Sequence, residues 1–225
     1  MAFTLHGAPL SPFVRKVMYL LTLSKTDYAL KIVAPGLMPD NFVNISPLKR
    51  IPVLQENDWH QADSSVICNY LIETLENDAL TQLIPATAKS RAQMRWLEKF
   101  ADYELAQWTS VTVFLQRVVR PASGKAPDEA RIQEALSQHL PPLLDYLASQ
   151  LGTQDYFIDN CFSLADIAIT SQMISFMHGG EHINHSRWPT LSAYFERMLA
   201  QPIWQTLVLR EQVTLKKLLN SRAPR

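Results

Sequence analysis

The sequence predicts two folded units, a small α/β domain in the order βαβ-ββα followed by an all-helical domain. Two observations support this division. Residues 1–78 alternate short strand patterns with helical ones, whereas residues 89–225 show long helical periodicity with no strand pattern. Residues 79–88 are expected to form the linker between the two units.

The first βαβ unit is predicted by three consecutive patterns. Residues 3–6 alternate like a short strand, and residues 28–33 read as a second one. Between them Ser11-Pro12 is a helix start, because serine is a favoured N-cap and proline is tolerated at the first helical position. The helix that follows has apolar residues at helical spacing: Val14, Val17, Met18 and Leu21.

A hairpin and a helix complete the α/β domain. Residues 52–55 and 59–61 are strand-like and flank a turn at 56–58. A helix over residues 64–76 follows, with an apolar face formed by Ile67, Tyr70, Leu71 and Leu75. These elements predict a small mixed sheet covered by helices.

Helical periodicity dominates the remainder of the chain. One helix runs through residues 94–108, and another through 132–147 is kinked or interrupted by Pro141-Pro142. Residues 163–177 are nearly all apolar, which predicts a buried helix. Two further helices are expected at 191–199 and 203–219.

Composition excludes several classes of protein. The 21 basic and 21 acidic residues balance, so the basic surface of a nucleic-acid binder is not expected. Cys68 and Cys161 form no CxxC motif and do not suggest a disulfide scaffold. The apolar stretch at 17–23 is far shorter than the roughly 20 residues that span a bilayer. With no secretory signal pattern either, we expect a cytoplasmic protein without a membrane partner.

Two motifs carry candidate chemistry. Ser11 begins a helix and Arg15 follows one turn later; the alternative is that Ser11 only caps the helix and Arg15 is solvated. Asp63-Ser64 begins another helix after the proline-headed strand at 52–54. A helix N-terminus with an acid and hydroxyls suggests a site for a small zwitterionic ligand. Its alternative is a simple N-cap with Asp63 in front.

The chain resembles the cytosolic glutathione transferases over nearly its whole length. The resemblance rests on the element order and on four segments: Ser11-Pro12-Phe13-Val14-Arg15-Lys16-Val17, residues 46–54, Asp63-Ser64 and Ser163-Leu164-Ala165-Asp166-Ile167. It implies a thioredoxin-like N-terminal domain. The Ser-Pro-Phe helix start is similar to that of serine-type bacterial and tau- or theta-like members.

This resemblance implies that Ser11 is the catalytic residue, donating a hydrogen bond to the glutathione sulfur, and that Arg15 supports it electrostatically. A free thiol has a pKa near 8.5, and the thiolate is the nucleophile. Lowering that pKa by about two units requires roughly 2.7 kcal/mol of preferential thiolate binding. Because Ser11 cannot form a mixed disulfide, addition of glutathione to an electrophile is favoured over disulfide reduction.

The resemblance also assigns the glutathione-binding residues. A cis Ile51-Pro52 bond would present the Val53 backbone to the cysteinyl part, as in an added strand. Arg50, with Lys49 as a competing candidate, would contact the glycyl carboxylate.

Asp63 would take the γ-glutamyl ammonium, and Ser64 with the helix N–H groups would take the carboxylate. The chain departs from the family in two places here. Asp63 replaces the commoner glutamate, and Gln61 stands at a position that is usually apolar.

The remaining motifs have simpler interpretations. Tyr103, Trp108 and Phe114 are candidates for an acceptor pocket facing Ser11, or else core residues. A metal site at 178–185 is set aside, because Gly179-Gly180 breaks the helix that would align its histidines. The capping box at Ser163 is taken as structural.

We therefore expect a homodimeric glutathione S-transferase that uses glutathione as co-substrate against a small hydrophobic electrophile, without a metal. Exposed interface residues are expected at Leu37, Met38 and Phe42. A glutathione-dependent peroxidase or isomerase, and a non-catalytic ligand-binding protein of the same fold, are the alternatives.

Overall fold

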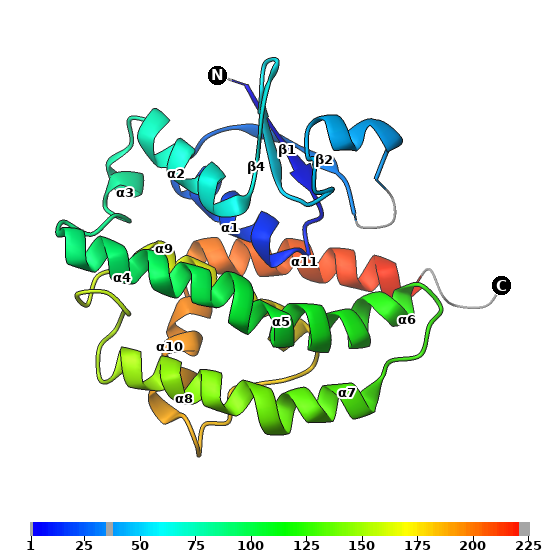
Figure 1. Ribbon diagram of the computed structural model, residues 1–225, viewed down its shortest axis with the longest axis vertical. Coiled ribbons are helices and arrows are strands. Elements are labelled where there is room, and N and C mark those ends of the chain that lie inside the picture. Colours follow the sequence, from blue (N-terminus) through cyan, green and yellow to red (C-terminus); the bar gives the residue numbers. More distant parts are fainter. Residues whose placement is uncertain (1, 35–37, 221–225) are drawn as a thin grey trace. The chain divides into compact units, whose positions relative to one another are not determined.

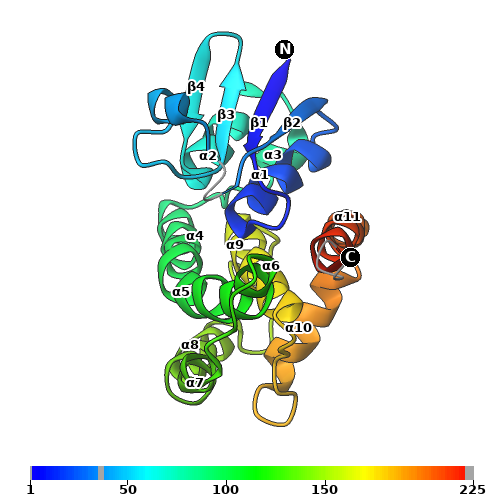
Figure 2. The same ribbon diagram turned by 90° about the vertical axis from the view of Figure 1, so that its right-hand side faces the viewer.

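A computed structural model describes residues 2–34 and 38–220, and Figures 1 and 2 show it in two views. The chain divides into two compact units, Met1–Leu83 and Ile84–Arg225. Each unit is described by itself below.

The N-terminal unit contains a mixed sheet in the strand order β2-β1-β3-β4, visible side by side in Figure 2. Strands β1 and β2 are parallel, while β3 is antiparallel to both β1 and β4. The strands are β1 (Phe3–Gly7), β2 (Tyr28–Ile32), β3 (Val53–Glu56) and β4 (Trp59–Ala62). Helix α1 (Pro12–Leu23) connects β1 to β2, and α2 (Ser64–Thr74) follows β4. The predicted βαβ-ββα order is confirmed.

Helix α1 begins as the sequence predicts and packs closely on β1. Ser11 is its N-cap and accepts a hydrogen bond from the Val14 N–H, with Pro12 at the first helical position. A Cβ atom on Gly7 would lie only 2.5 Å from Val14 Cγ2, so a glycine is needed where β1 ends against the helix. Leu5 and Leu54, paired across β1 and β3, are fully buried.

The segment before β3 folds onto the sheet. A short 3-10 helix, η1 (Asp40–Asn44), places Phe42 in a buried cluster with Val33 and Val53. The prediction that Phe42 is an exposed interface residue is therefore wrong, because this apolar ring is covered by the loop's own packing on the sheet. Met38 is partly buried against the same cluster, and Leu37 lies outside the described residues.

Two elements fall at the junction expected to be a linker. A short helix, α3 (Asp78–Thr81), is capped by the Asn77 side chain, which accepts from the Leu80 N–H. Helix α4 then begins at Ala88, with Thr87 as its N-cap.

The helical unit is built from two long runs that lie alongside each other (Figure 1). Both runs contain π-helical segments. The π-helical segment that precedes Pro141-Pro142 ends at His139, and a new α-helix begins at Leu140, so the predicted interruption is present. The first run comprises α4 (Ala88–Phe100), η2 (Ala101–Leu105), α5 (Ala106–Trp108), η3 (Thr109–Val119) and α6 (Arg120–Ala122). The second comprises α7 (Glu129–Glu134), η4 (Ala135–His139) and α8 (Leu140–Leu151).

Helix α9 (Leu164–His178) is buried and packs against the first run and α10 (Pro189–Leu199), as its apolar sequence predicts. The chain then enters α11 (Pro202–Asn220). The capping box of α9 is present, with Asp166 accepting hydrogen bonds from the Ser163 backbone and hydroxyl. In the described part of the chain, every helix is too short or too polar to cross a membrane.

Candidate functional site

The three polar segments singled out from the sequence meet at one end of the sheet. Val53, the first residue of β3, pairs with His6 of β1 on one side and with Ala62 of β4 on the other. Asp63 directly follows Ala62, and β1 ends one residue after His6, so the loop leading to Ser11 starts here too. The register of β3 thus brings the cis-proline segment and the start of α2 together.

Ser11 is half-buried and its backbone is fixed by a hydrogen bond from its own N–H to the Ala8 carbonyl, at 3.0 Å. The Val14 N–H lies 3.5 Å from Ser11 Oγ, a long capping bond. In that bond Ser11 Oγ is the acceptor, so its own proton remains available to donate.

Arg15 is fully buried, so the interpretation of a solvated side chain is wrong. Its Nη2 donates to the Leu10 carbonyl at 3.4 Å, which ties the start of α1 to the loop before it. Water screens a buried charge less than an exposed one. The electrostatic effect of Arg15 on Ser11 stays a prediction.

The Ile51-Pro52 peptide bond is cis, as the resemblance implied. Lys49 and Arg50, which precede this bond, have exposed side chains. The backbone of Lys49 has φ 49°, and the Arg50 backbone N–H donates to Ser46 Oγ. Both cations therefore remain candidates for a carboxylate contact.

Asp63 is itself the N-cap of α2. Its Oδ1 accepts from the N–H groups of Ser65 at 3.0 Å and Val66 at 3.1 Å, and Ser64 is the first helical residue. In the simple-cap alternative the capping residue is therefore Asp63 and not Ser64, and ligand binding at this helix start stays a prediction. Asp63 is exposed and has φ 76° and ψ 121°, a conformation that costs a non-glycine residue about 1–3 kcal/mol.

Two buried residues at this end of the sheet were not anticipated. Lys16 is 1% exposed and its Nζ lies 3.0 Å from Ser65 Oγ. His6 is also buried, with Nε2 at 2.9 Å from Gln55 Oε1, and burial lowers its pKa below the ordinary value. Lys16 lies off the apolar stripe of α1, so nothing in the local pattern signalled its burial.

The three candidate acceptor-pocket residues have different environments. Tyr103 is 61% exposed beneath the Lys99 ammonium, whereas Phe114 is buried in the core. The Trp108 ring stacks on His139 with centroids 3.8 Å apart and planes at 3°. Core packing therefore accounts for Phe114 and helix pairing for Trp108, and an acceptor role for these residues stays a prediction.

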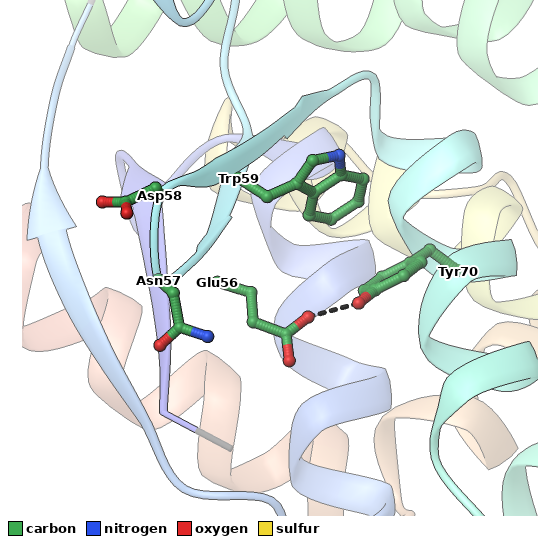
Figure 3. A pocket seen from close by; sticks show the side chains of 5 residues that line it. All are labelled: Glu56, Asn57, Asp58, Trp59 and Tyr70. Atoms are coloured by element: carbon green, nitrogen blue, oxygen red, sulfur yellow. Dashed lines mark hydrogen bonds between the residues drawn. The ribbon is translucent and has the colours of Figure 1, made fainter.

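A separate hollow of about 510 Å³ lies at the turn of the β3–β4 hairpin, at the opposite end from Val53 and Ala62. Figure 3 shows its lining: Trp59 and Tyr70 face each other with ring centroids 4.5 Å apart, and the Tyr70 hydroxyl donates to Glu56. That hydrogen bond raises the pKa of Tyr70. Asp58 points away from the aromatic pair in Figure 3, so the polar groups do not converge on one ligand.

The helical unit holds a further titratable pair, and its histidine belongs to the segment set aside as a metal site. His178 Nε2 lies 2.7 Å from Glu211 Oε2, with both side chains buried. Among the described residues, no group of three His, Cys, Asp or Glu side chains is arranged to hold a metal ion. Cys68 is buried and Cys161 exposed, and neither of the two forms a disulfide.

Family models match both units of the chain. Residues 5–78 match the glutathione S-transferase N-terminal domain, and residues 106–202 match the glutathione S-transferase C-terminal domain. The chain is 31% identical to glutathione S-transferase 3 of Zea mays over 212 residues, which covers 91% of this chain and 92% of that protein. It is 27% identical to glutathione S-transferase F14 of Arabidopsis thaliana, over 75% of this chain and 67% of that protein.

Solved structures share the fold. A glutathione S-transferase from Rhodospirillum rubrum F11 superimposes with a TM-score of 0.80 at 21% identity, covering 91% of each chain. A structure of glutathione S-transferase III in its apo form gives a TM-score of 0.77 at 27% identity, over 93% of this chain and 96% of that one. The fold is thus a thioredoxin-like sheet domain followed by an all-helical domain, as the sequence predicted.

Proposed function

Because the chain belongs to the glutathione S-transferase family, we propose that it is a serine-type glutathione transferase. The reaction is attack of the bound glutathione thiolate on a small hydrophobic electrophile. As for the family in general, we expect a homodimer that acts in the cytoplasm. Neither unit of the chain gives the identity of the electrophile.

One observation carries the proposal: the β3 register brings a cis-proline segment beside a helix N-terminus capped by an acid. In the proposed complex the Val53 backbone pairs with the cysteinyl part, Arg50 contacts the glycyl carboxylate, and the α2 N-terminus binds the γ-glutamyl end. Ser11, with an uncommitted proton at the start of α1, donates to the thiolate. Buried Arg15 adds positive potential from one turn away.

The proposal is tested on the full chain with immobilised glutathione and with a panel of electrophilic acceptors. Retention together with thiol addition supports a transferase, whereas retention without turnover indicates a glutathione-binding protein that is not catalytic. Absence of retention overturns the proposal. Peroxide reduction and isomerisation assays in the same panel identify the two enzymatic alternatives.

Ser11→Ala isolates the role of the hydroxyl. We expect the variant to bind glutathione while the pKa of the bound thiol rises by about one to two units, which ultraviolet absorbance of the thiolate measures. Thr22→Ala, on the same helix, also removes a hydroxyl and serves as the matched control. An unchanged thiol titration in Ser11→Ala removes this residue from its role.

A further inference from the structure

We propose that the outer face of α11 docks on the surface of a membrane that contains anionic phospholipids. This outer face consists of five exposed residues: Leu209, Arg210, Val213, Lys216 and Lys217. The expectation of a protein without a membrane partner rested on the lack of a spanning stretch, and a helix that lies on a membrane needs no spanning length. The inference goes beyond the proposed glutathione chemistry and does not depend on it.

The inner side of α11 is fixed to the helical unit. Trp204, Leu207 and Glu211 are at most 1% exposed, and their spacing of three and four residues places them on one side of the helix. Glu211 Oε2 lies 2.7 Å from His178 Nε2 of α9, so the only acidic residue of α11 is turned inward. In Figure 2, α11 (red) lies at the outer edge of the helical unit.

The outer face has apolar residues at its centre and cations at its margins. Leu209 and Val213 lie one helical turn apart and are 62% and 53% exposed. Lys216 and Lys217 follow Val213 by three and four residues, so one of them lies on each side of the apolar pair at the next turn. Arg210 directly follows Leu209 and adds a third exposed cation.

This arrangement is typical of a helix that lies at a membrane interface. The apolar side chains of such a helix enter the boundary between headgroups and acyl chains, while lysine stems extend so that the ammonium groups stay beside the lipid phosphates. Among the ion pairs of residues 2–34 and 38–220, none involves Arg210, Lys216 or Lys217. Their charges are therefore available to an anionic surface.

The charge of the whole chain is distributed unevenly in favour of this face. Residues 202–225 contain five basic residues and one acidic residue, whereas residues 1–201 contain 16 basic and 20 acidic residues. The balanced total of the sequence therefore conceals a positive C-terminal segment. Clusters of about four to eight lysines and arginines on an amphipathic helix are typical of segments that bind anionic phospholipids.

The small apolar area favours a lipid surface over a protein partner. A stable protein interface buries about 1,200–2,000 Å² around an apolar core, and two exposed apolar side chains do not provide such a core. Binding to a membrane surface is instead the sum of shallow insertion and several weak charge contacts. The outer face of α11 supplies both contributions.

Vesicle sedimentation of the full chain tests the inference. Vesicles of phosphatidylcholine mixed with phosphatidylserine are compared with vesicles of phosphatidylcholine alone. We expect the protein to bind the anionic vesicles in preference to the neutral ones. Added salt should release it from them, because salt screens charges at an exposed surface.

The charge contribution is tested by combining Lys216→Gln with Lys217→Gln. This double variant should bind the anionic vesicles on the order of tenfold more weakly, because each cation near the surface contributes to the attraction. Lys89→Gln with Lys125→Gln is the matched control: both lysines are exposed in the helical unit outside α11, and the net charge changes equally. The control should bind as the wild type does. Lys216→Arg with Lys217→Arg keeps the charge and should retain binding.

The apolar contribution is tested by Leu209→Gln. We expect this variant to bind the anionic vesicles on the order of fivefold more weakly, because a side chain that inserts has been made polar. Leu115→Gln is its matched control, since Leu115 is 38% exposed on η3. Circular dichroism and thermal unfolding establish that each variant is folded.

Several results would overturn the inference. They are absence of binding to anionic vesicles at low salt, equal binding to both kinds of vesicle, and an equal loss in the control variants. Sedimentation velocity without vesicles examines a contact between copies: a lower oligomeric state in the Lys216→Gln, Lys217→Gln variant would assign the face to that contact instead. If this variant is not folded, Arg210→Gln replaces it, with a smaller loss expected, and unchanged binding contradicts the proposal.

Discussion

Ser46 holds the backbone of Arg50 through two hydrogen bonds of a single hydroxyl. Ser46 Oγ accepts from the Arg50 N–H at 3.0 Å and donates to the Arg50 carbonyl at 2.8 Å, and Ser46 is buried. The residue just before the cis Ile51-Pro52 bond is therefore fixed in its backbone while its guanidinium extends into solvent. The Lys49 N–H also donates to Ser46, to its carbonyl oxygen at 2.8 Å, whereas the Ser46 hydroxyl holds Arg50 at both its N–H and its carbonyl.

This anchoring favours Arg50 over Lys49 as the contact for the glycyl carboxylate. We expect Arg50→Gln to weaken glutathione binding by about 1–2 kcal/mol, because a charge-assisted hydrogen bond is lost. Lys49→Gln is the matched control and should change affinity little. Calorimetry with an analogue whose glycine is replaced by ethylamine checks the assignment: a loss of the same size for this analogue would show that Arg50 does not contact the carboxylate.

Asp63 combines a cap with a candidate charge contact, and two substitutions separate them. Asn caps a helix about as well as Asp and tolerates positive φ, so Asp63→Asn should leave thermal stability nearly unchanged. It should weaken glutathione by about 1.5–3 kcal/mol through loss of the ammonium partner. Asp63→Ala should lose affinity similarly and also about 1 kcal/mol of stability. Unaltered affinity in both variants reduces Asp63 to a cap.

Gly7 and Val14 form a tight contact that sets the position of α1. Gly7→Ala should destabilise the N-terminal unit by about 1–3 kcal/mol, because its Cβ would overlap Val14 Cγ2. Val14→Ala removes the overlapping atoms, so the double variant should be less destabilised than the sum of the two single ones. Urea unfolding of all four proteins measures this coupling. If the destabilisations of the two single variants add exactly in the double variant, α1 moves to accommodate the new methyl group even when Val14 is intact.

Asp166 makes the stability of the helical unit depend on pH. Burial raises its pKa to about 6, although the Ser163 and Phe157 N–H groups and the Ser163 and Tyr194 hydroxyls donate to it. Between about pH 4 and 6 the unfolded state has released this proton while the folded state retains it.

The contribution of Asp166 to the free energy of unfolding should therefore fall as the pH rises from about 4 to 6, and should stay constant above pH 6. The total change is at most about 3 kcal/mol. Comparing urea unfolding of the wild type and Asp166→Asn across pH 4–7 isolates this effect, since Asn does not titrate. If the difference in unfolding free energy between the two proteins stays constant across this pH range, burial does not raise the pKa of Asp166.

The α/β fold was predictable from sequence because its signals are local. Alternation marks the strands, and Ser11-Pro12 marks a helix start whatever surrounds it. The Asp63 cap was harder, because Asp and Ser are equally good caps when adjacent. Strand register decides between them, since Ala62 is the last residue to pair with β3.

The burial of Lys16 was not predicted, because its cause is tertiary. Lys16 is buried because α1 packs against α2 as well as the sheet, which no window within α1 reveals. The grouping of Tyr103, Trp108 and Phe114 assumed α-helical spacing. The π-helical segments at 101–105 and 109–119 use i→i+5 hydrogen bonds and change which face each residue occupies.

The hairpin turn at Asn57-Asp58 offers a place to attach a reporter. Both residues are exposed, and the paired strands β3 and β4 separate them from the Val53–Ala62 end where ligand binding is proposed. Asn57 already has φ 53°, so a glycine-rich insertion or a cysteine-linked fluorophore at Asp58 meets little backbone resistance. Trp59 directly follows, so an attached dye would sense its ring while the ligand-binding end of the sheet keeps its native sequence.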